Sequence, residues 1–83
     1  RSMGRNGNIS IKEKHQLFLM DLGSNLKKIR KEKGLGLDKT ASLSDISRTQ
    51  LDSIEKGISN ATIATLYALS KVLDVKLSEM FKF

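Results

Sequence analysis

The chain has no cysteine, no proline and no tryptophan among its 83 residues. Without cysteine it can form neither a disulfide framework nor a zinc finger, so apolar packing has to hold the fold together. Long apolar runs are also missing, since the longest, Leu17-Phe18-Leu19-Met20, falls far short of the roughly 20 residues of a membrane span. The length allows one domain and excludes a two-domain enzyme. The absence of cysteine suits a cytoplasmic location.

Acidic residues are scarce relative to basic ones: 15 Lys and Arg against 9 Asp and Glu give a net charge of +6. Such an excess indicates a polyanionic partner, with nucleic acid favoured over an anionic membrane. The excess is confined to residues 1–34, which carry nine basic and three acidic side chains, whereas residues 35–83 carry six of each. We therefore expect the N-terminal part to supply most of the non-specific attraction to phosphate.

Residues 1–9 read as a flexible basic arm because glycine, asparagine and arginine dominate them. Arg1 and Ser2, which precede Met3, resemble a cloning remnant. We expect residues 10–83 to form a single domain. Its first helix is predicted over 11–33, because Ser10 and Glu13 form a capping-box pattern and Gly34 provides a left-handed stop.

Three further helices follow from shorter signals. Gly36 is a candidate N-cap for a helix over 37–44, and Asp45 occupies the tight turn after it. Ser47 and Gln50 fit a second capping box for a helix over 47–56, which Gly57 ends. A fourth helix begins after a cap at Thr62 and carries an expected buried stripe, with a final turn over 77–81. The stripe consists of Ile63, Leu66, Leu69, Val72 and Leu73. No strand-like alternation is present, so the prediction is an all-α fold.

A helix, a tight turn and a second helix with a polar start is the arrangement that places one helix in the DNA major groove. Residues 22–81 resemble the Cro/phage-repressor, or XRE-like, helix-turn-helix family. The matching stretches are LGSNLKKIRKEKGL at 22–35, ISRTQLDSIEKG at 46–57 and TIATLYALSKVLDVKLSEMF at 62–81. The resemblance implies a compact five-helix, lambda-repressor-like domain, here with an extended first helix. The start at Ser47-Arg48-Thr49 also resembles controller proteins of restriction–modification systems.

The helix over 47–56 is the expected recognition helix, since Leu51 and Ile54 would anchor it and leave a polar face outward. The resemblance implies base contacts from Arg48, Thr49 and Ser53, with Asp52 beside them as a further candidate for a base contact. Arg48 suits a bidentate contact to guanine O6 and N7, and Asp52 suits cytosine N4. The residues expected to contact the DNA backbone are Lys39, Ser47, Lys56, Asn60 and Thr62. A merely solvated helix face is the alternative reading of these residues.

The resemblance also implies an ion pair between Arg30 and Glu55 that ties the recognition helix to the first helix. The chain departs from the family pattern at several places. Gly36-Leu37 replaces a Ser/Thr-Gln start, Thr40 and Ser44 stand at apolar positions, Asp45 stands at a turn glycine, and residues 58–61 include no basic side chain. These departures weaken the expected grip on the DNA backbone but not the expected fold.

Other chemistry has little support in the sequence. His15 is the only histidine and has no cysteine partner, so we expect no metal site, and Gly34-Leu35-Gly36 lacks the third glycine of a dinucleotide loop. We expect neither a cofactor nor an enzyme. Five of the seven residues 27–33 are basic, which also suits an acidic membrane or partner groove. We favour no membrane contact, because Leu22, Leu26 and Ile29 on the same helix are needed for the core.

The resulting hypothesis is a transcriptional regulator that binds a roughly palindromic operator on double-stranded DNA as a homodimer. The expected dimer interface consists of Val75, Leu77, Met80, Phe81 and Phe83. A second candidate surface consists of Leu17, Phe18 and Met20. The alternative is a protein-interaction module, such as an antitoxin, whose partner protein would bind the leucines of the 37–44 helix and the apolar start of the first helix.

Overall fold

The computed structural model describes residues 9–83, so the predicted basic arm lies outside the described residues except for Ile9. Residues 9–83 form four α-helices and one 3-10 helix, without a strand. The elements are α1 (Ile11–Glu32), α2 (Leu37–Leu43), α3 (Arg48–Glu55), α4 (Ile63–Leu73) and η1 (Leu77–Phe81). The all-α prediction is confirmed. The predicted fifth helix is η1, a 3-10 helix of five residues.

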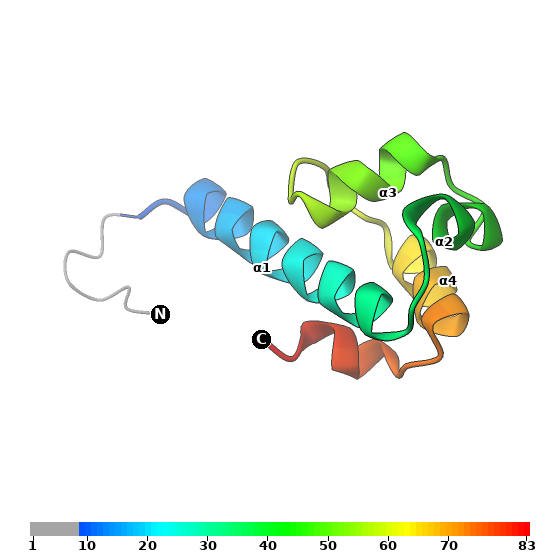
Figure 1. Cartoon of the computed structure of the whole chain (residues 1–83). Helices are drawn as coiled ribbons and strands as arrows, with labels where there is room; N and C mark the ends of the chain where they lie inside the picture. The colour runs from blue at the N-terminus through cyan, green and yellow to red at the C-terminus, as the bar shows by residue number, and fades with distance from the viewer. Residues whose placement is uncertain (1–8) are drawn as a thin grey trace.

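The helix α3 packs against one side of α1, and η1 returns along the opposite side of it (Figure 1). The helix α2 packs against α3 and α4, and α4 also packs against η1. The first turns of α1 project beyond the other helices (Figure 1). The described chain therefore measures 43 × 21 × 19 Å, with its long dimension set by a helix of 22 residues.

Local chemistry sets the helix ends as the sequence predicts. At the start of α1, Ser10 Oγ accepts from the Glu13 amide at 3.1 Å, and Glu13 Oε1 accepts from the Ser10 amide at 2.9 Å. At the start of α3, Ser47 Oγ accepts from the Gln50 amide at 3.0 Å, so the serine half of the second capping box is present. The ends at Gly34 and Gly57 have the expected positive φ of 70° and 72°.

All four α-helices and η1 contribute to the core. Its buried apolar side chains are Leu22, Leu26, Ile29, Ala41, Leu51, Ile54, Leu66, Leu69, Leu73 and Met80. Two predictions are wrong here. Ile63 is 66% exposed, because it is the first residue of α4 and lies beyond the edge of the core. Met80 is 0% exposed, because η1 turns it onto α1 and α4, so it is a core residue and not part of a dimer interface.

The buried face of α2 is small and partly polar. Thr40 and Ala41 are buried, and Thr40 Oγ1 donates to the carbonyl of Gly36 at 2.8 Å. Ser44 is also buried, but its hydroxyl has no hydrogen-bond partner among the described residues. Asp45, which stands at the position of a turn glycine, adopts the expected left-handed conformation with φ 60°.

Candidate nucleic-acid interface

The helix α3 lies on an outer side of the molecule with α2 beside it (Figure 1). Leu51 and Ile54 fix it to the core and are 1% and 2% exposed. The opposite face is polar: Arg48 and Thr49 are exposed, and Asp52 and Ser53 are half-buried. The structure therefore brings the four predicted base-contacting residues together on one helix.

An ion pair between Arg30 and Glu55 joins α1 to the last turn of α3. Arg30 Nε donates to Glu55 Oε2 at 2.7 Å, and Arg30 Nη2 donates to Glu55 Oε1 at 3.0 Å. The two side chains are only 9% and 4% exposed. The hydrogen bonds to Glu55 raise the pKa of Arg30, against the opposing effect of burial. Arg30 Nη1 also donates to the carbonyl of Leu35 at 2.9 Å, so one guanidinium fixes both α3 and the chain before α2.

The charged side chains on the exposed face of α3 are already paired. Arg48 Nε lies 2.7 Å from Asp38 Oδ1, an acidic residue in the first turn of α2. Lys56 Nζ lies 2.9 Å from Asp52 Oδ2. The hydrogen bond from Lys56 lowers the pKa of Asp52, with smaller contributions from the charges of Arg48 and Lys27. Sequence reasoning missed Asp38, because nothing in the spacing of the two residues shows that the turn brings them together.

The residues expected at the DNA backbone lie on several different elements. Lys39 is exposed on α2, and Ser47 is the N-cap of α3. Thr62 caps α4 by accepting from the Thr65 amide at 3.1 Å and donates its own hydroxyl to Thr65 Oγ1 at 3.1 Å. The Thr62 hydroxyl is therefore engaged within the helix cap.

Asn60 makes a contact that the sequence did not predict. Its Oδ1 lies 3.0 Å from Nε2 of His15, across a separation of 45 residues in the chain. His15 is exposed, as expected, and this hydrogen bond ties the loop after α3 to the projecting part of α1.

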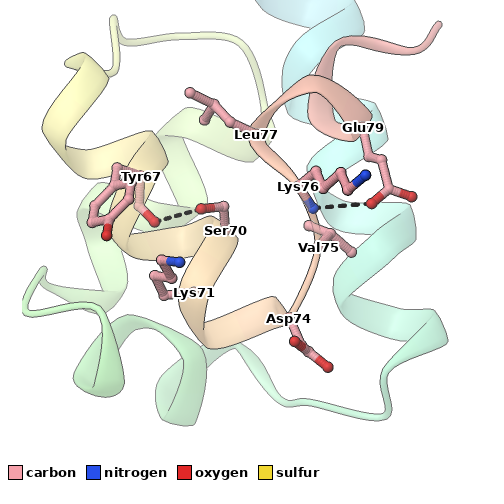
Figure 2. A pocket seen from close by; sticks show the side chains of 8 residues that line it. All are labelled: Tyr67, Ser70, Lys71, Asp74, Val75, Lys76, Leu77 and Glu79. Carbon is pink, nitrogen blue, oxygen red and sulfur yellow. Dashed lines mark hydrogen bonds between the residues drawn. The ribbon is translucent and has the colours of Figure 1, made fainter.

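The remaining candidate interface residues fall on two surfaces. Val75 and Leu77 are half-buried and line a groove of about 540 Å³ between α4 and η1 (Figure 2). The other residues that line it are Tyr67, Ser70, Lys71, Asp74, Lys76 and Glu79 (Figure 2).

Phe81 and Phe83 lie instead against α1. The Phe18 ring centroid is 6.2 Å from that of Phe81 and 5.7 Å from that of Phe83. Both candidate surfaces thus meet at Phe18, since Phe81 and Phe83 belong to the first predicted set and Phe18 to the second.

Within residues 9–83, no group of three or more His, Cys, Asp or Glu side chains is placed to hold a metal ion. None of the helices in this part of the chain is both long enough and apolar enough to cross a bilayer.

The sequence of this chain is similar to those of known helix-turn-helix proteins. The family model described as "Helix-turn-helix" (HTH_3) matches residues 26–80. The chain is 39% identical over 59 residues to the uncharacterized HTH-type transcriptional regulator y4dJ of Sinorhizobium fredii, which covers 71% of this chain and 77% of that protein. It is 42% identical over 60 residues to the control protein C.MunI of Mycoplasma sp., which covers 71% and 81%.

A solved structure shares the arrangement of helices. The restriction-modification controller protein C.AhdI from Aeromonas hydrophila superposes with a TM-score of 0.75 at 30% identity, over 76% of this chain and 96% of that chain.

Proposed function

Because this chain belongs to the helix-turn-helix family (HTH_3), we propose that it is a sequence-specific DNA-binding transcriptional regulator that reads DNA with α3. The main support for the proposal is that α3 is held rigidly against the rest of the domain. Its inner face is packed into the core and its last turn is held by the buried Arg30–Glu55 pair, while its outer face is polar. A helix held in this way keeps its outward side chains in a fixed position relative to the base edges in the major groove.

Each outward side chain has a proposed role. Arg48 would donate to guanine O6 and N7, and Asp52 would accept from cytosine N4, while Thr49 and Ser53 would contact neighbouring bases. Lys39, Ser47 and Lys56 would contact phosphates, which position the protein without selecting a sequence. Asn60 would contribute through its Nδ2, because its Oδ1 is used by His15. Thr62 remains a proposed backbone contact, although its hydroxyl already caps α4.

We propose that the regulator acts as a homodimer on a roughly palindromic operator. An α3 of eight residues reads few base pairs, and two half-sites about 34 Å apart, one turn of DNA, multiply the specificity. The proposed interface is the groove that includes Val75 and Leu77, together with Phe81 and Phe83. The similarity to two controller proteins supports a role in restriction–modification control and a non-enzymatic activity.

Selection of bound duplexes from a random DNA pool tests the proposal. We expect two inverted half-sites, and affinity that falls steeply as salt rises. Arg48→Ala should remove the preference for the selected duplex and leave weak, salt-sensitive binding. Lys14→Ala, which removes the same charge at the exposed start of α1, should keep the preference. A wild-type protein without salt-sensitive affinity for DNA would rule the proposal out.

The second candidate is a protein-interaction module of the antitoxin kind. Its support is the exposure of apolar side chains that do not belong to α3, with Leu43 57%, Ile11 78% and Phe18 44% exposed. Leu43→Ser would then abolish partner binding without changing DNA affinity, whereas the regulator proposal requires Arg48 and not Leu43.

A further inference from the structure

Each basic side chain on the exposed side of α3 forms an ion pair with a carboxylate. Its basic residues Arg48 and Lys56 are each within 2.9 Å of a carboxylate, on Asp38 and Asp52 respectively. The remaining acidic residue of the helix, Glu55, is paired with Arg30. A helix that only had to adhere to phosphate would leave its cations free, because each free cation adds to non-specific affinity.

Asp38 engages Arg48 in a geometry that is compatible with reading a base. The contact of 2.7 Å is made at Nε, and the two side chains are 79% and 69% exposed. A guanidinium carries five N–H donors, and one carboxylate occupies at most two of them at a time. Donors therefore remain on the same planar group for guanine O6 and N7 while Asp38 stays bound.

Resting on the proposed function, we infer that Asp38 is a positioning residue that makes Arg48 a reader of guanine instead of a phosphate-binding cation. Two physical effects act in the same direction. Holding the guanidinium before DNA arrives reduces the side-chain entropy that a bidentate contact would lose. A phosphate, unlike guanine, must compete with the carboxylate for a charge that is already neutralised. Asp38 thus increases the preference of Arg48 for guanine and lowers its affinity for phosphate.

The test measures Kd for a duplex selected from the random pool and for a scrambled duplex of equal length, each at several salt concentrations. For Asp38→Asn we expect tighter binding of the scrambled duplex and a fall of about tenfold in the ratio of the two affinities, within the range of one bidentate base contact. For the scrambled duplex, the slope of the logarithm of the binding constant against the logarithm of the salt concentration should steepen by about 1, because Arg48 is then free to bind a phosphate. In an Arg48→Ala background, Asp38→Asn should leave that slope unchanged.

Glu13→Gln is the matched control. It removes the same charge at the exposed start of α1, where glutamine can still accept from the Ser10 amide in the capping box. It should change neither the affinity ratio nor the slope. Thermal unfolding of Asp38→Asn should match wild type, since an exposed ion pair contributes little stability.

Equal gains on both duplexes, with the ratio intact, would overturn the inference and leave Asp38 as a simple repulsive charge. If wild type itself shows no preference for any selected duplex, the proposed function fails instead, and the two failures are therefore distinguishable.

Discussion

The buried pair of Arg30 and Glu55 shows how one side chain links several parts of this molecule. Three donors of the guanidinium are used, two on the carboxylate and one on the Leu35 carbonyl. Glu55 is the last residue of α3. The pair therefore sets where α3 ends relative to α1, and neither side chain lies on the exposed face of α3.

We predict that Glu55→Ala lowers the free energy of unfolding by about 3 kcal/mol, because it leaves a buried guanidinium unpaired. The melting temperature of a domain of this size should fall by more than about 10 °C. Differential scanning calorimetry measures the change, and Glu32→Ala on the exposed side of α1 is the control. An unchanged melting temperature would show that the pair does not hold α3.

Two buried hydroxyls of α2 and its C-cap should respond in opposite directions. Ser44 Oγ has no partner among the described residues, so Ser44→Ala should raise the free energy of unfolding by about 1 kcal/mol. Thr40 Oγ1 is hydrogen-bonded to Gly36, so Thr40→Val should lower it by about 1 kcal/mol. Urea denaturation at constant m-value measures both. A change of the free energy of unfolding in the same direction for both variants would contradict the hydrogen bonding described for these two hydroxyls.

At the scale of elements, the contact between α1 and α3 depends on a glycine within a helix. A Cβ at Gly23 would overlap the carbonyl oxygens of Ile54 and Glu55, so only a residue without a side chain lets the two helices approach this closely. Gly57, which has φ 72°, similarly leaves no room for a Cβ beside the backbone of Met20. These contacts fix how α3 sits on α1.

Gly23→Ala should therefore destabilise the protein by about 2 kcal/mol through overpacking, although alanine has the higher helix propensity. The neighbouring Ser24→Ala lies on the exposed side of α1 and should be neutral or slightly stabilising. Chemical denaturation compares the two variants. DNA selectivity of any folded Gly23→Ala protein should fall as well, because α3 would be displaced.

The turn between α2 and α3 carries a strain that one substitution should relieve. Asp45 has φ 60°, a conformation that glycine adopts without a Cβ penalty. We expect Asp45→Gly to raise the free energy of unfolding by roughly 0.5–1 kcal/mol and Asp45→Ala to lower it. Asp45→Asn, which also removes the charge, separates electrostatics from backbone strain: a gain equal to that of glycine would attribute the effect to charge.

At the scale of the whole molecule, the fold divides the basic run of α1 between two sides. Lys27 is close enough to Asp52 on α3 for its charge to lower the pKa of that carboxylate. Lys28 lies instead beside Asp21 and Phe83, where α1 meets the C-terminal segment. Part of the N-terminal excess of charge therefore faces the proposed DNA surface, and part does not.

This division predicts different effects for two adjacent lysines. Lys27→Gln should weaken binding to a scrambled duplex and reduce the magnitude of the salt slope by about 1. Lys28→Gln, with the same change of charge, should leave the slope unchanged. Fluorescence anisotropy titrations at several salt concentrations measure both, and equal losses would mean that phosphate attraction depends only on total charge.

The sequence by itself determined the features that depend on residues a few positions apart. The caps at Ser10, Ser47 and Thr62 and the left-handed ends at Gly34 and Gly57 follow from hydrogen bonds and φ angles within one turn. Helical spacing likewise predicted most of the core. The resemblance of residues 22–81 to the helix-turn-helix family implied the pairing of Arg30 with Glu55, which the sequence alone did not reveal.

Only the tertiary structure decided how those helices meet. The need for glycine at position 23, the burial of Met80, the contact of Phe83 with Phe18 and the pairing of Asp38 with Arg48 all join different elements. Such contacts depend on crossing angles and on the direction of each turn, which local patterns leave open. The tertiary structure also showed that the basic side chains Arg48 and Lys56 on the proposed DNA-reading face are each paired with a carboxylate. We therefore expect basic residues elsewhere in the chain to provide most of the non-specific attraction to phosphate.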